Sequence, residues 1–287
     1  MLMSLRDAIL PVLGVTVLLI AGVFAWVYFT QERLIFYPQA LDEGTARIFQ
    51  RSYPDAQPFE LETERGVRLR GWLVGNGRAR APRPLVIYFG GNAEEVSWLG
   101  PEWSRVPAWA LLLVNYRGYG LSDGRPTEAA LYRDALALYD RAAGLTDIDA
   151  RRVVVLGRSL GTGVATYLAS QRPVAGVVLI SPYDNLVEVA RAVYPFLPVD
   201  RFMRYRFDSA ARAGRIHAPL LALVAAQDTL ILPERSRQLV QAWGGPARLE
   251  VLDGVAHGDI QLHPRYWPLI AAFLAERSAL PAAALAR

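Results

Sequence analysis

The stretch that decides the fold covers residues 153–165 and reads VVVLGRSLGTGVA. It opens with four apolar residues typical of a strand buried on both faces, and it continues into small residues that let a helix start close to a sheet. Between the two lies the pattern Gly-x-Ser-x-Gly, in which a sharp strand-to-helix turn exposes a serine hydroxyl. The stretch therefore predicts Ser159 as a nucleophile at the end of a central strand.

The same five-residue pattern occurs again at residues 120–124, so the pattern alone is a weak signal. Ser122 lies several residues beyond the nearest predicted strand, and Gly124 and Pro126 follow it, which is typical of a loop. Because a nucleophile elbow needs a strand before it and a helix after it, the context favours Ser159.

Short apolar runs alternate with helical stretches along most of the chain. Strands are predicted at 59–64, 68–74, 85–89, 110–115, 153–156, 177–180, 220–224 and 249–252, and helices at 127–143, 160–170, 234–243 and 266–276. The middle strands are continuously apolar, as expected for parallel strands. This alternation predicts an α/β fold with a mostly parallel twisted sheet and helices on both faces.

The N-terminal region contains a segment long enough to cross a membrane. No charged residue occurs from Ala8 to Gln31, and these 24 residues would extend ~36 Å as a helix, against a hydrocarbon layer of ~30 Å. A cleaved signal peptide is the alternative, because Val23-Phe24-Ala25 resembles a cleavage site. The apolar run continues through that site without a polar region, which favours an uncleaved anchor.

We therefore expect a membrane anchor over residues 1–33, with its transmembrane helix at about 8–29, and a catalytic domain over residues 34–287. The charges that flank the helix, Arg6 on one side and Glu32-Arg33 on the other, favour a single-pass protein with its N-terminus inside.

Composition excludes several classes of function. The 287 residues include no Cys, and all 31 basic side chains are Arg, against 27 acidic ones. Schiff-base and PLP chemistry need Lys, whereas thiol nucleophiles, disulfides and thiolate metal sites need Cys. The three His are too few and too badly spaced for a zinc cluster, so we expect neither a metal nor a cofactor. The Arg residues alternate with acids along the chain, which favours a solvated or lipid-facing surface over nucleic-acid binding.

A serine nucleophile needs a base and an acid that orients the base, and both are expected further along the chain. His257 follows the strand that ends near residue 252, and Asp228 follows the strand at 220–224. Both therefore lie at the carboxyl edge of the sheet, where open α/β proteins build their sites. His217 and His263 do not lie after a strand and are predicted to be structural. These positions predict a triad of Ser159, Asp228 and His257.

Two backbone N–H groups are needed to bind the oxyanion of a tetrahedral intermediate. One is expected from Leu160, the residue after the nucleophile. The other is expected from Asn92, because the loop at residues 89–92 follows an early strand and its two glycines permit a close approach of the backbone.

Several segments together resemble one family. They are QERLIFYP (31–38), YFGGNA (88–93), NYRGYG (115–120), GRSLGTG (157–163) and SPYD (181–184). The combination is similar to the membrane-anchored abhydrolase branch of the α/β-hydrolase superfamily, which includes fungal bud-emergence-like proteins and mammalian depalmitoylases and carries a serine aminopeptidase-like label. The resemblance spans most of residues 34–273 and implies an α/β-hydrolase fold with the triad Ser159, Asp228 and His257. Relatives commonly carry His-Gly-Asn where this chain has Gly90-Gly91-Asn92.

The segment from Ser181 to Pro219 is the only one long enough to cover the site as a short flap. It contains the apolar run 194–199, followed by Arg201, Arg204 and Arg206. We expect either that an acyl chain binds under this flap with a polar head near the arginines, or that the apolar residues pack the flap onto the sheet.

The expected function is a membrane-anchored serine hydrolase that cleaves small-molecule or lipid-like esters or thioesters through an acyl-enzyme intermediate. The first alternative is a serine peptidase or aminopeptidase-like hydrolase. A dinucleotide-binding protein would use Gly161-Thr162-Gly163 and Asp184. A catalytically silent, membrane-tethered interaction protein is the third alternative.

Overall fold

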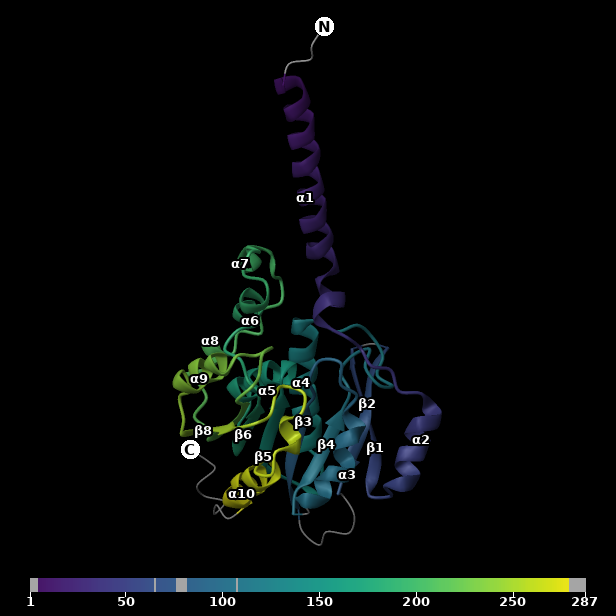
Figure 1. Cartoon of the computed structure of the whole chain (residues 1–287). Coiled ribbons are helices and arrows are strands. Elements are labelled where there is room, and N and C mark those ends of the chain that lie inside the picture. The colour runs from purple at the N-terminus through teal and green to yellow at the C-terminus, as the bar shows by residue number, and fades with distance from the viewer. Residues whose placement is uncertain (1–4, 65, 76–81, 107, 279–287) are drawn as a thin grey trace.

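In a computed structural model of the chain, a single sheet lies at one end of a long N-terminal helix (Figure 1). The structure describes residues 5–64, 66–75, 82–106 and 108–278. The outermost residues of the predicted anchor and of the predicted domain, 1–4 and 279–287, lie outside the described residues.

The sheet has eight strands in the order β1-β2-β4-β3-β5-β6-β7-β8. Their bounds are Ala56–Glu64 (β1), Val67–Val74 (β2), Arg83–Phe89 (β3), Ala110–Val114 (β4), Ile148–Arg158 (β5), Gly176–Ile180 (β6), Leu220–Ala225 (β7) and Ala247–Leu252 (β8). β2 pairs antiparallel with β1 and β4, and every other pair is parallel. All eight predicted strands are present, and the predicted fold class is confirmed.

Helices cover both faces of the sheet. One face carries α4 (Glu128–Ala143), α5 (Leu160–Gln171), α8 (Ala210–Ala213) and α9 (Pro233–Gln241), and the other carries α2 (Glu43–Ser52), α3 (Leu99–Glu102) and α10 (Tyr266–Ser278). Successive residues of β3 enter the two cores in turn, Ile87 on the first face and Val86 and Tyr88 on the second. Burial on both faces explains why the central strands are apolar throughout.

The N-terminal helix, α1, runs without a break over Leu5–Ile35. Its Leu13–Ile35 part is long and apolar enough to cross a membrane, and the most apolar stretch of that part is not buried in the protein. The last turns nevertheless belong to the folded domain, because the buried Gln31 donates to Phe202 O at 2.6 Å and accepts from Arg204 N at 2.9 Å. The expected boundary between anchor and domain therefore falls inside one continuous helix.

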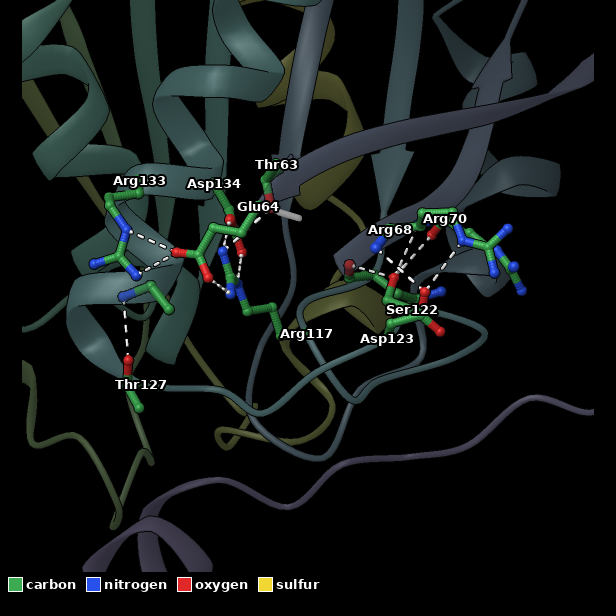
Figure 2. A network of polar contacts seen from close by, with 12 residues as sticks. Thr63, Glu64, Arg68, Arg70, Arg117, Ser122, Asp123, Thr127, Arg133 and Asp134 are labelled. Carbon is green, nitrogen blue, oxygen red and sulfur yellow. Dashed lines mark hydrogen bonds and ion pairs between the residues drawn. The ribbon is translucent and has the colours of Figure 1, made fainter. Parts of the chain in front are cut away.

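A buried ion pair ties the loop after β4 to α4 (Figure 2). Arg117 Nε and Nη2 each donate to one oxygen of Asp134 at 2.6 Å, and only 5% of either side chain is exposed. Arg117 Nη1 also donates to Glu64 at 2.9 Å, and the hydrogen bonds from Arg117 and Arg133 lower the pKa of Glu64 to about 2. The guanidinium thus joins β1, α4 and the loop at one point.

We expect Arg117→Ala to lower the free energy of unfolding by about 3 to 5 kcal/mol, because it leaves the Asp134 carboxylate buried without its partner. Urea denaturation of the detergent-solubilised chain measures this loss. The control is Arg151→Ala, which removes a guanidinium that is 61% exposed and pairs with Asp149 at 3.2 Å. It should cost less than about 1 kcal/mol, because Arg152 still pairs with Asp149 at 2.9 Å. Equal losses in the two variants would contradict the role given to the buried pair.

Candidate active site

Ser159 lies on the turn between β5 and α5 with φ +49° and ψ −119°. Residues other than glycine rarely adopt this backbone conformation. The turn requires glycine on either side of it. A Cβ on Gly157 would lie 2.5 Å from Gly161 O, and a Cβ on Gly161 would lie 2.1 Å from Phe89 O. Both glycines of the motif are therefore needed for close backbone contact, and they bring the elbow against the end of β3.

The three predicted triad residues lie together at the carboxyl edge of the sheet. His257 Nε2 is 2.9 Å from Ser159 Oγ, and His257 Nδ1 is 2.7 Å from Asp228 Oδ2. The second oxygen of Asp228 accepts hydrogen bonds from the N–H groups of Leu230 and Ile231 at 3.0 and 2.8 Å. The three residues follow β5, β7 and β8, which are strands far apart in the sequence.

The environment of Asp228 keeps this carboxylate ionised. Its side chain is completely buried, and burial alone would raise its pKa. The hydrogen bond and charge of His257, together with the Ile231 N–H, outweigh burial and hold the pKa of Asp228 below its usual value. An ionised carboxylate can hold the imidazole in one orientation and stabilise the imidazolium.

The loop after β3 lies directly against Ser159. A Cβ on Gly91 would be 3.5 Å from Ser159 Cβ. The N–H groups on either side of Asn92 are engaged, that of Gly91 with Glu94 and that of Ala93 with Asn92 Oδ1. Leu160 is the first residue of α5, so its N–H has no acceptor within the helix. The backbone N–H groups of Asn92 and Leu160 thus remain the candidate oxyanion donors.

The side chain of Asn92 holds the loop in place. Its Oδ1 accepts from Tyr37 N at 2.9 Å and from Tyr119 Oη at 3.0 Å. Tyr37 lies two residues beyond the end of α1, so the loop is joined directly to the chain that leaves the long helix.

Glu94 is the functional candidate that the sequence analysis missed. It is 7% exposed and accepts hydrogen bonds from Gly91 N at 2.7 Å, Tyr88 Oη at 2.5 Å, Trp98 Nε1 at 2.8 Å and Arg158 Nη1 at 3.1 Å. Burial, with the nearby Glu94 charge, raises the pKa of Tyr88 and keeps its hydroxyl a donor. A carboxylate therefore braces the loop in which relatives commonly carry an imidazole. The available signal was an acid two residues after Asn92.

The second Gly-x-Ser-x-Gly pattern has a structural role. Ser122 is buried, donates to Asn115 O at 2.9 Å and accepts from Arg70 N at 2.9 Å, which fastens the loop to β2 (Figure 2). The side chain of His217 lies 3.4 Å from Gly244 O, and that of His263 accepts from Arg265 N at 3.1 Å. Among the described residues, neither of these two histidine side chains is hydrogen-bonded to Ser159, Asp228 or His257.

The residues of the dinucleotide alternative serve the packing of the fold. A Cβ on Gly163 would lie 2.6 Å from Tyr183 Oη, so this glycine lets α5 approach its neighbours. Asp184 is buried in an ion pair with Arg235 at 3.2 Å. No group of three metal-binding side chains occurs among the residues that the structure describes.

The flap contains α6 (Leu186–Val193) and α7 (Val199–Phe202). Phe196, between the two helices, is 97% exposed. The Phe196 side chain therefore neither encloses an acyl pocket nor packs the flap onto the sheet. Both expectations for the apolar run 194–199 are wrong for this residue.

Comparisons with known proteins agree with this architecture. The family model for the alpha/beta hydrolase fold matches residues 84–213. An uncharacterized protein of Mycobacterium tuberculosis is 36% identical over 259 residues, which cover 90% of this chain and 91% of that protein. Protein bem46 of Schizosaccharomyces pombe is 28% identical over 295 residues and covers 95% of this chain and 96% of its own length.

Among solved structures, the Pyrococcus furiosus esterase Pf2001 superposes with a TM-score of 0.64 at 21% identity, covering 83% of this chain and 98% of its own. That likeness shows the fold. The family match and the relatives together establish that the chain belongs to the alpha/beta hydrolase fold family.

Proposed function

We propose that the protein is a serine hydrolase that cleaves carboxylic ester or thioester bonds through an acyl-enzyme intermediate. The observation that carries this proposal is the hydrogen-bond chain from Ser159 Oγ through the His257 ring to the buried Asp228 carboxylate. A serine hydroxyl is a weak nucleophile until a neighbouring base removes its proton. In this hydrogen-bond chain, His257 would be the base and Asp228 the acid that orients it.

In the proposed reaction, Ser159 Oγ attacks the carbonyl carbon while His257 Nε2 takes the hydroxyl proton. Asp228 stabilises the imidazolium that forms. His257 then gives the proton to the leaving alcohol or thiol, which releases it and leaves the acyl group on Ser159. Water, deprotonated by His257, cleaves the acyl-enzyme by the same steps and regenerates the serine.

The developing oxyanion would lie between the N–H groups of Leu160 and Asn92. Donors held in advance at this position stabilise the transition state more than the substrate, and loss of one donor commonly costs about 10²- to 10³-fold in kcat. The Glu94 network supports this assignment, because it holds the loop against Ser159 without using the Asn92 N–H.

Ser159→Ala should abolish both labelling by a fluorophosphonate probe and turnover of p-nitrophenyl acetate, because the probe and the substrate need the same activated hydroxyl. Ser122→Ala is the matched control, since it removes the other serine of the same pattern and should keep labelling near the wild-type level. Circular dichroism checks that both variants fold. Labelling that persists in Ser159→Ala would refute the assignment, and a wild-type chain that never labels would favour the silent interaction protein.

Glu94→Ala should lower kcat about 10- to 100-fold with little change in KM, because the oxyanion loop loses its brace while the rest of the site is kept. Glu94→Gln, which preserves the size of the side chain, should retain part of the activity. The control is Glu102→Ala, which breaks an exposed pair with Arg105 at 2.9 Å. A kcat loss no larger than that of Glu102→Ala would contradict the bracing role.

We further propose that α1 anchors the protein in a membrane and is not removed. The apolar Leu13–Ile35 span supports this, as does the stacking of Phe24 on Phe202 at 4.8 Å, which cleavage after Ala25 would destroy. Intact mass of the membrane-extracted protein is expected to include residues 1–25. A species that begins near Trp26 would instead indicate a cleaved signal peptide.

The orientation of the anchor is a separate proposal. The flanking charges favour the N-terminus inside, which would put the domain on the outer side of the membrane. Because the chain contains no Cys, Ile48→Cys on α2 provides a single reporter site. A membrane-impermeant maleimide should label it in intact cells if this orientation is right, and only after lysis if it is reversed.

For the substrate, we propose a lipid-like acyl ester or thioester, because the triad is joined to a membrane-length helix through Asn92 and Tyr37. A series of p-nitrophenyl esters and acyl thioesters of two to twelve carbons should give a kcat/KM that rises with acyl length. Aminoacyl-arylamides in the same assay represent the peptidase alternative. If the arylamides are cleaved best, the peptidase is the correct function.

A further inference from the structure

The loop between α6 and α7 carries an apolar surface that the fold leaves uncovered. Residues 192–198 read AVYPFLP, contain no charged side chain and are all exposed. Phe196 is 97% exposed and Tyr194 is 56% exposed. We call residues 192–198 the flap tip. Contiguous apolar surface of this kind commonly marks an interaction site.

The segment that follows the flap tip is fastened along α1. Gln31 binds the backbone of Phe202 and Arg204, and the Phe24 ring stacks on the Phe202 ring with the centroids 4.8 Å apart. Phe24 and Gln31 are seven residues apart and therefore lie on the same face of the helix. The contact covers two turns of α1, which is ~10 Å along its axis.

These contacts fix the level of the flap relative to the membrane-length helix. Phe24 lies inside the apolar Leu13–Ile35 span, and Trp26 and Tyr28 next to it are exposed. Exposed Trp and Tyr near the end of such a span are typical of the boundary between headgroups and acyl chains. Phe202 therefore lies at the same depth as this boundary. Figure 1 shows α6 and α7 rising beside α1 on the same side of the sheet.

The segment that follows the flap tip, residues 199–206, carries three arginines and one acid, Asp200, among apolar residues. Arg201 is exposed, and the Arg204 guanidinium lies 5.7 Å from the centre of the Tyr28 ring. Long Arg side chains can keep their stems among apolar groups while their charges reach headgroup phosphates. An apolar tip with basic residues at its base is the pattern of an element that lies in the surface of a bilayer.

The candidate active site lies on this same side of the domain. Tyr37, just past the end of α1, donates to Asn92 of the oxyanion loop at 2.9 Å. The flap itself continues from β6, and Ser181 at the end of β6 donates its N–H to Leu223 O of β7, the strand that leads to Asp228. The anchor, the flap and the triad therefore meet at one edge of the sheet.

We propose that the flap tip is embedded in the headgroup and upper acyl region of the leaflet next to the domain, so that the candidate active site opens toward that leaflet. The ligand chemistry that fits is an amphiphile whose acyl chain already lies in the bilayer. This inference rests on the proposed anchoring of α1 and adds a second membrane contact to it.

The absence of Cys gives a direct test, because Phe196→Cys provides one attachment site for a nitroxide label in the full-length chain. One chain is placed in each nanodisc of phosphatidylcholine and phosphatidylglycerol at three to one. EPR then measures how often the label collides with oxygen, which is enriched in lipid, and with a nickel chelate that stays in water. Val17→Cys in α1 and Ile48→Cys on α2, which are 56% and 63% exposed, are the lipid and water controls.

We expect position 196 to resemble position 17, with oxygen collisions favoured and nickel collisions at least fivefold rarer than at position 48. If nickel collisions at position 196 equal those at position 48, the inference is wrong. If position 17 is in lipid in the same experiment, the proposed anchoring of α1 is still supported. Rare collisions with both reagents would mean that the tip packs against protein, which also overturns it. Nickel access at position 17 would refute the anchor and the inference together.

Leu197→Cys, in the same tip, gives a second reading if Phe196→Cys does not fold. These experiments measure how deeply the label lies in the bilayer, so their result does not depend on whether Ser159 is a nucleophile. Fluorophosphonate labelling of the same labelled chains reports on the serine hydrolase separately.

Discussion

The positive φ of Ser159 is the constraint on which the rest of the site depends. A residue held in this conformation costs of order 1–3 kcal/mol, and it persists only where the surrounding structure determines it. Here β5 is a central strand with neighbours on both sides, and α5 packs so closely that Gly161 meets the end of β3. The same approach brings the loop after β3 against the serine and points the first N–H of α5 toward the same space. The positions of the candidate nucleophile and of the candidate oxyanion donors thus follow from a single backbone turn.

Much of the fold could be predicted because parallel strands buried on both faces leave an unmistakable apolar run. The exceptions have physical reasons. β5 begins at Ile148, five residues before the predicted strand. The prediction missed this first part because it contains the charged residues Asp149, Arg151 and Arg152, which break the apolar run. α2 was not predicted because it buries only Ala46 and depends on its cap, in which Asp42 accepts from Thr45 N. α6 and α7 were missed because each is short and held by contacts with distant segments.

The candidate triad could be predicted because chain order and strand ends place all three groups at one edge. Glu94 could not be predicted in the same way. Its role arises only when the loop folds back and brings Tyr88, Trp98 and Arg158 around one carboxylate. Phe196 illustrates a different limit, since the sequence marks a residue as apolar but does not determine what it faces. The direction of the flap became clear only from the contacts of Phe202 and Arg204 with α1.

The continuity of α1 into the domain has a kinetic consequence. A domain joined to its anchor by a flexible linker can take many orientations relative to that anchor. Here the helix ends at Ile35 and the chain enters the domain without a flexible linker. The last turns of the helix are bound to the flap through Gln31 and Glu32, and Tyr37 just after it binds Asn92. A domain held in a bilayer by such a helix would turn and tilt only together with the helix. Encounters would then depend on lateral diffusion of substrate within the leaflet, so that the rate would follow the surface mole fraction of substrate and not its bulk concentration.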